Sequence, residues 1–139
     1  MKKLLFFLVV AVTVGLGLML AVEPAFAHHA FASEFDANKR VELKGTIVKM
    51  LWTNPHGWLY IDVKEPDGKT ATWALEFGGP TALYKRGWRK EDLPVGAEVS
   101  VKGYLAKNGT KTANASNVVL SDGRTLFAGS SGTGAPEAQ

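Results

Sequence analysis

Alternating hydrophobic and polar positions dominate the chain from about residue 41 onward and predict a β-protein. The run from Val41 to Trp52 is rich in β-branched and aromatic residues, and a second run, Trp58 to Lys64, alternates strictly. Between the two runs lies Thr53-Asn-Pro-His-Gly57, whose Asn-Pro pair and glycine are typical of a loop. The pattern predicts two strands joined by a loop, and we interpret the loop as the rim of the domain at which a ligand binds.

The next turn predicts the register of the second and third strands. Pro66-Asp67-Gly68 fits a three-residue hairpin loop with the glycine in the left-handed position. That loop places Ile61 opposite Trp73 on the core side and Trp58 opposite Glu76 on the outer side. A two-residue loop would mix the two faces of the hairpin, so it is the poorer interpretation.

The order of the remaining elements predicts the fold class. A short helix is expected to follow Gly78-Gly79-Pro80, with Leu83 and Tyr84 facing inward, and two strands are expected near 98–105 and 112–120. Three strands, a short helix and two strands predict an all-β fold: a five-stranded OB-fold-like Greek-key barrel with one short helix. The alternative, an SH3-like barrel, has its helical turn later in the chain.

The first 27 residues have the organisation of an export signal. Lys2-Lys3 precede an apolar run, Leu4 to Val22, and Ala25-Phe-Ala27 is a small-residue cleavage site. We expect a Sec-type signal peptide and a periplasmic protein; because the apolar run exceeds the usual length of about 7–15 residues, an uncleaved membrane anchor is the alternative. The predicted division is a signal helix at 1–27, a leader arm at 28–40, the barrel at 41–128 and a disordered tail at 129–139.

Charge and cysteine content narrow the partners. The chain has no cysteine, so no disulfide stabilises the domain and packing alone must hold it together. Its net charge is +3. No dense Lys/Arg stripe is present, and we therefore expect no nucleic-acid partner, and membrane contact only through an uncleaved signal segment.

Several short motifs resemble a family of small exported bacterial proteins that is catalogued as a domain of unknown function. The most specific of them is Trp-Thr-Asn-Pro-His, at residues 52–56, within a likeness that extends over nearly all of the mature chain. The resemblance implies an exported β-barrel and assigns no activity. The other matching motifs are Phe35-Asp36, Leu43-Lys-Gly45, Trp73-Ala-Leu-Glu76, Arg86-Gly-Trp88, Gly96, Val101-Lys-Gly103, Asp122-Gly123 and Leu126-Phe127.

The candidate ligand site lies around the 53–57 loop and the outer face of the strand that follows. We interpret the chain as a non-enzymatic binding module that recognises a small ligand or a periplasmic protein at this rim. Glu76 is interpreted either as a partner that orients His56 or as a solvated strand carboxylate. The structural alternative for His56 is a loop histidine that caps a backbone group or stacks on Trp52 or Trp58. The predicted ligand-binding residues are Trp52, Asn54, His56, Trp58, Tyr60 and Glu76.

The histidines supply a second hypothesis, a copper-binding protein. Cleavage after Ala27 would make His28 the first residue, whose free amine and imidazole can chelate one metal ion. His29 or His56 would supply a further nitrogen, and such nitrogen ligands suit Cu(II). The N-terminal pair resembles histidine-brace copper proteins, although a terminus without any ligand is the simpler interpretation. Copper is thus a candidate cofactor and no other is indicated.

The sequence contains none of the common catalytic motifs that we considered. The serines lie in no G-x-S-x-G elbow, there is no cysteine nucleophile, and neither a P-loop nor a G-x-G-x-x-G sequence occurs. We therefore predict that the protein is not an enzyme.

Overall fold

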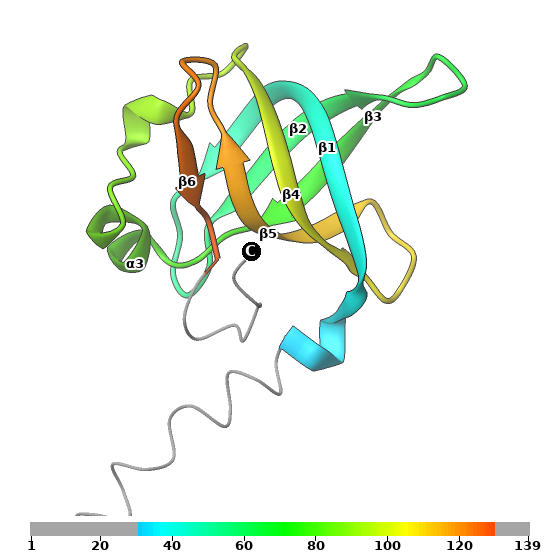
Figure 1. Ribbon diagram of the computed structural model, residues 1–139, viewed down its shortest axis with the longest axis horizontal. Helices are drawn as coiled ribbons and strands as arrows, with labels where there is room; N and C mark the ends of the chain where they lie inside the picture. Colours follow the sequence, from blue (N-terminus) through cyan, green and yellow to red (C-terminus); the bar gives the residue numbers. More distant parts are fainter. Residues whose placement is uncertain (1–30, 130–139) are drawn as a thin grey trace, which may run out of the picture.

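The computed structural model describes residues 31–129 and shows a mostly antiparallel β-fold with only short helical segments. Six strands form one sheet in the order β3-β2-β1-β4-β5-β6, and a further parallel pairing joins β3 to β5 (Figure 1). The strands are β1 (Phe35–Leu51), β2 (Trp58–Lys64), β3 (Thr70–Glu76), β4 (Glu98–Ala106), β5 (Thr112–Val119) and β6 (Thr125–Phe127); the helices are α3 (Pro80–Lys85) and the 3-10 turn η1 (Lys90–Asp92).

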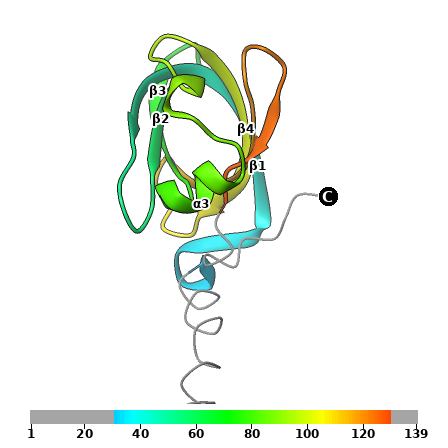
Figure 2. The ribbon, with the colours of Figure 1, turned by 90° about the vertical axis from the view of Figure 1, so that its left-hand side faces the viewer.

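The β3–β5 pairing closes the first five strands into a ring. Figure 2 shows these strands curving around a common interior, with α3 at one end. The predicted all-β class with short helices is confirmed. The ring has the strand order expected of an OB-fold, and assignment to that fold stays a prediction. The sheet has six strands rather than the five predicted, because residues 125–127 pair with β5.

The register of the β2–β3 hairpin is as predicted. Ile61 pairs with Trp73 and Trp58 pairs with Glu76, while Glu65 N–H donates to the Lys69 carbonyl at 2.8 Å across the turn. Every second residue of β2 faces the core, and Leu59 and Ile61 are fully buried there. Glu76 lies on the outer side as predicted, but it is buried there, so the alternative of a solvated carboxylate is wrong. The prediction that Tyr84 faces inward is also wrong, because Tyr84 is 37% exposed and stacks on Trp52.

β1 begins at Phe35, earlier than the predicted start at Val41. Residues 31–34 are helical and precede it directly. Phe31 stacks on Phe35 and meets Tyr104 of β4 edge to face, and all three rings are buried. This small cluster lies apart from the main core, and it fixes residues 31–35, which we call the arm, against the outer face of β4.

The main core fills the ring and includes Trp88, which is fully buried. Its indole N–H donates to the Phe127 carbonyl at 2.9 Å, and its ring packs 5.7 Å from that of Phe77. Trp88 therefore ties the segment after α3 to β6. Trp73, which the alternation also placed on the core side, is only partly buried, since its indole N–H reaches out to Glu65.

Trp88→Ala is expected to lower the free energy of unfolding by about 3–5 kcal/mol, the usual cost of emptying a buried aromatic site. Urea unfolding followed by circular dichroism measures this change. Val95→Ala, at a side chain 73% exposed, is the control and should cost under about 0.5 kcal/mol. A loss of about 1 kcal/mol or less for Trp88→Ala would mean that the indole does not anchor β6.

Candidate functional site

The 53–57 loop is held against the segment that follows β3. Gly57 N–H donates to the Gly78 carbonyl at 3.2 Å, and Phe77 N–H donates to the Gly57 carbonyl at 2.8 Å. The Pro55 carbonyl oxygen lies 2.6 Å from where a Cβ on Gly79 would stand, so only glycine permits this approach. The loop, which contains a cis Asn54–Pro55 bond, is therefore a pinned element of the surface.

This pinning brings the His56 ring onto Glu76. His56 Nδ1 lies 2.8 Å from Glu76 Oε1; the histidine side chain is 33% exposed and the glutamate side chain 5%. A contact of this length requires one proton between the two atoms, carried by either the imidazole or the carboxyl. Because the contact uses Nδ1, the other ring nitrogen, Nε2, is left for a ligand.

The Glu76 carboxyl holds its proton unusually tightly. Burial raises its pKa from 4.5 to about 7, and the negative charge of Glu34 in the arm adds to the rise. The neighbouring Asn114 amide opposes this rise in the pKa, although neither of its polar atoms makes a hydrogen bond of ordinary geometry. Near neutral pH the carboxyl is thus close to half protonated.

A row of outer-face side chains crosses four strands at this point. Trp58 of β2 pairs with Glu76 of β3, Glu76 pairs with Asn114 of β5, and Asn114 pairs with Tyr104 of β4. The two middle members are buried and polar, with Glu76 4% and Asn114 1% exposed. Buried polar groups with unfilled hydrogen-bonding capacity are uncommon in folded proteins, and they mark this seam as unusual.

An open groove of about 510 Å³ lies beside the row, between the arm, the start of β2 and the β4–β5 loop. Trp58 connects the groove to the His56–Glu76 pair, since its side chain lines the groove and its backbone pairs with Glu76. Lys107 fastens the arm to one wall, with its Nζ donating to the Ala32 carbonyl at 2.5 Å. The lining residues are Ser33, Glu34, Phe35, Trp58, Ala106, Lys107, Asn108 and Thr112.

The structure brings together half of the predicted ligand residues. His56, Trp58 and Glu76 form one cluster, whereas Trp52 stacks on Tyr84 with ring centroids 5.7 Å apart. Asn54 is exposed on the loop, with its side chain toward Gly79. Tyr60 lies further along β2, where the Lys49 ammonium sits 5.8 Å from its ring centroid.

Sequence reasoning missed Glu34 and Asn114. Glu34 belongs to the arm, whose Phe31 and Phe35 spacing gave a signal for packing but not for where the arm would lie. Asn114 stands between two core alanines in β5, Ala113 and Ala115. This alternation marks Asn114 as an outer-face residue, and nothing near it in the sequence indicates that the outer face is buried at this point.

The proposed copper ligands His28 and His29 lie outside the described residues, as does the predicted signal segment. Within residues 31–129, no group of three or more His, Cys, Asp or Glu side chains is arranged to hold a metal ion. The same part of the chain has no helix long and apolar enough to span a membrane.

The fold and the site define a small β-protein with a buried carboxylate–histidine pair beside an open groove. The chain belongs to a family of unknown function, DUF6152, whose model matches residues 17–115. The matched range includes His56, Glu76 and Asn114, so the whole pair lies within the family's domain. No functionally curated protein matches the sequence.

Glu76→Gln is expected to flatten the pH dependence of stability. Because the folded pKa of about 7 exceeds the usual 4.5, the folded state binds the proton more tightly. This contribution is complete below pH 4.5 and is lost as the pH rises to 7, by up to about 3 kcal/mol. Glutamine cannot titrate, so urea unfolding between these pH values should show a smaller decline than the wild type.

The matched control for this prediction is Glu42→Gln, an exposed carboxylate on β1 that should leave the slope unchanged. A Glu76→Gln protein with the wild-type slope would show that some other group titrates. The groups that face Glu76 are His56 and Glu34, and His56→Gln would then identify the imidazole contribution.

Proposed function

We propose that this chain is a non-enzymatic binding module of the periplasm, which recognises a small ligand or a peptide of a partner protein beside the 53–57 loop. The observation that carries the proposal is the His56–Glu76 contact at 2.8 Å, next to an open groove. A buried carboxyl that orients a partly exposed imidazole provides a fixed polar contact, and Trp58, the strand partner of Glu76, connects this contact to the groove.

The groove supplies the other kinds of contact that a ligand site needs. Trp58 offers an aromatic surface, and Asn108 and Thr112 bring an amide and a hydroxyl to the opposite side. The arm closes one wall and is itself fixed, because Lys107 N–H donates to the Glu34 carbonyl at 2.8 Å. An open groove that combines an aromatic side chain with polar and charged groups can bind a small polar ligand or a peptide.

A fragment library tests this function by NMR on the mature chain. Fragments that bind should shift the amide signals of Trp58, Ala106 and Thr112, and Trp58→Ala should weaken their affinity about tenfold or more, a loss of about 1.4 kcal/mol. Tyr84→Ala is the matched control, since it removes an aromatic ring near the loop but outside the groove. Fragments that bind equally well to Trp58→Ala would contradict the proposed site.

A second candidate function, copper binding, is favoured by the same contact. Histidine ligands of metals commonly donate their second ring N–H to a carboxylate, which fixes the ring and raises its basicity. Glu76 stands in that relation to His56 Nδ1. The arm that precedes β1 runs beside Glu76, since Glu34 raises the pKa of Glu76, and His28 and His29 stand just before the arm in sequence.

Copper binding is tested by titrating Cu(II) into protein that begins at His28. One equivalent should bind, with affinity falling as the pH drops through the imidazole range near 6.5. His56→Ala should weaken binding strongly and Glu76→Gln about 10–100-fold, the usual effect of removing a carboxylate behind a histidine ligand. Glu42→Gln is the control. If His56→Ala leaves the affinity unchanged, any bound metal belongs to the terminus alone.

A further inference from the structure

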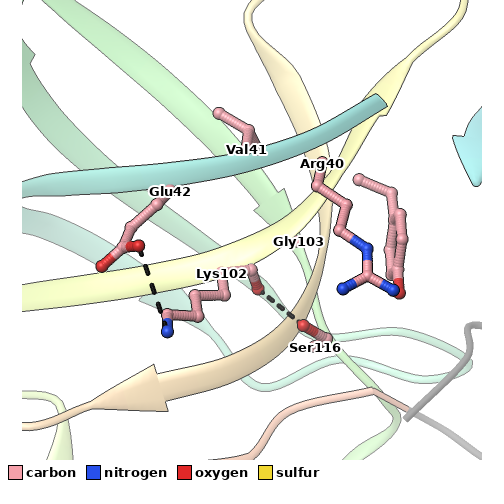
Figure 3. A pocket seen from close by; sticks show the side chains of 7 residues that line it. Arg40, Val41, Glu42, Lys102, Gly103 and Ser116 are labelled. Carbon is pink, nitrogen blue, oxygen red and sulfur yellow. Dashed lines mark hydrogen bonds and ion pairs between the residues drawn. The ribbon is translucent and has the colours of Figure 1, made fainter. Parts of the chain in front are cut away.

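A second groove, of about 330 Å³, lies on the outer face of the sheet where β1, β4 and β5 run side by side (Figure 3). It is separate from the groove beside His56, and no lining residue is common to the two. Residues from all three strands line it: Arg40, Val41, Glu42, Lys102, Gly103, Tyr104 and Ser116.

The groove results from two interruptions of regular strand pairing. Between β4 and β5 the partners pass from Lys102–Asn117 to Gly103–Ala115, so Ser116 is the extra residue of a bulge. Between β1 and β4 the register shifts just before Arg40. Bulges redirect side chains and are over-represented next to binding sites.

Two further features shape the floor of this groove. A Cβ on Gly103 would lie 2.3 Å from the Asn114 carbonyl oxygen, so only glycine lets β4 and β5 approach this closely beside the bulge. The Ser116 side chain is fixed, with its hydroxyl donating to the Lys102 carbonyl at 3.0 Å. Ser116 is 2% exposed, and because its hydroxyl hydrogen is used by the Lys102 carbonyl, its side chain contributes to the shape of the groove and not to the charge.

The charges around the groove favour an anion. Arg40 lies with its guanidinium 5.9 Å from the centre of the Tyr104 ring, and none of the carboxylates in residues 31–129 forms a salt bridge with it. Lys102 Nζ is 4.0 Å from Glu42, with both side chains more than half exposed, so this pair is weak. Figure 3 shows Arg40 and Lys102 on either side of Ser116.

We propose that this groove binds the oxyanion of a small phosphate- or carboxylate-bearing molecule, with the Arg40 guanidinium as its principal contact. The planar fork of arginine matches two oxygens of such a group, and an ammonium on the other side adds charge without fixing the geometry. The Glu42 carboxylate at the rim selects against larger polyanions that would extend along β1. This site is independent of the function proposed for the His56 groove.

The test is an NMR titration of the folded protein with inorganic phosphate and, separately, with acetate, at constant ionic strength. We expect saturable shifts of the Gly103 and Ser116 amide signals, with a Kd on the order of 1 mM for the preferred anion. Arg40→Gln should weaken that binding about tenfold or more, since charge-assisted hydrogen bonds to arginine are lost. Stronger binding of phosphate or of acetate identifies which of the two groups the natural ligand carries.

The control is Lys39→Gln, which removes the same charge from the neighbouring residue, whose side chain lies outside the groove and pairs with Asp36 at 3.9 Å. It should retain at least half of the wild-type affinity. Two results would overturn the proposal: shifts of both amides that do not saturate with either anion, or equal losses in Arg40→Gln and Lys39→Gln. The second would show that only the overall charge matters.

Discussion

The structure depends on a short parallel pairing that closes the ring of strands. Residues 74–76 of β3 pair with residues 112–114 of β5, and Ala74 N–H also donates to the Lys111 carbonyl at 3.0 Å. Without this seam β3 would be a free edge beside β2, and the core of the ring would open on one side. The same pairing places Glu76 directly beside Asn114, so the contact that closes the ring of strands also assembles the row of polar side chains.

A seam that buries a carboxyl and an amide is costly unless something stabilises them. His56 contributes the contact to Glu76, and the 53–57 loop must be pinned for that ring to stay in place. Next to the seam, Phe31 and Phe35 of the arm pack with Tyr104 of β4, the strand partner of Asn114, in a small buried cluster. The negative charge of Glu34 instead disfavours the ionised form of Glu76. Together with burial it raises the pKa of Glu76 to about 7. Conflicts between local stability and side-chain choice are characteristic of functional sites.

The parts of the fold that followed local rules could be predicted from the sequence. Alternation and one turn were enough for the register of β2 and β3, because a single hairpin loop fixes every pair along it. His56 and Glu76 were both chosen as site residues, on the strength of a loop and an outward position. A contact between them was one of the two interpretations of Glu76, and the sequence could not decide between the two because the contact depends on how residues 77–79 hold the loop.

The parts that failed depended on contacts distant in sequence. Tyr84 was expected to face the core from its short helix, yet the ring of Trp52, just after β1, is a flat stacking partner outside the core. β1 begins earlier than predicted because Phe35 pairs with Ala106, and nothing near Phe35 in the sequence indicates β4. Asn114 acquires its meaning only when β5 meets β3.

The arm connects the two grooves through the strand that it begins. Phe35 lines the groove beside Trp58, whereas Arg40 of the same strand lines the anion groove, and β4 faces both through Ala106 and Tyr104. The irregular pairing between Phe35 and Arg40 lies between the two grooves. The other irregularity in the pairing of β1 lies between Ile47 and Lys49, opposite β2. Phe31 of the arm and Arg40 both lie against the Tyr104 ring, so one aromatic side chain holds a wall of the first groove and also lines the second.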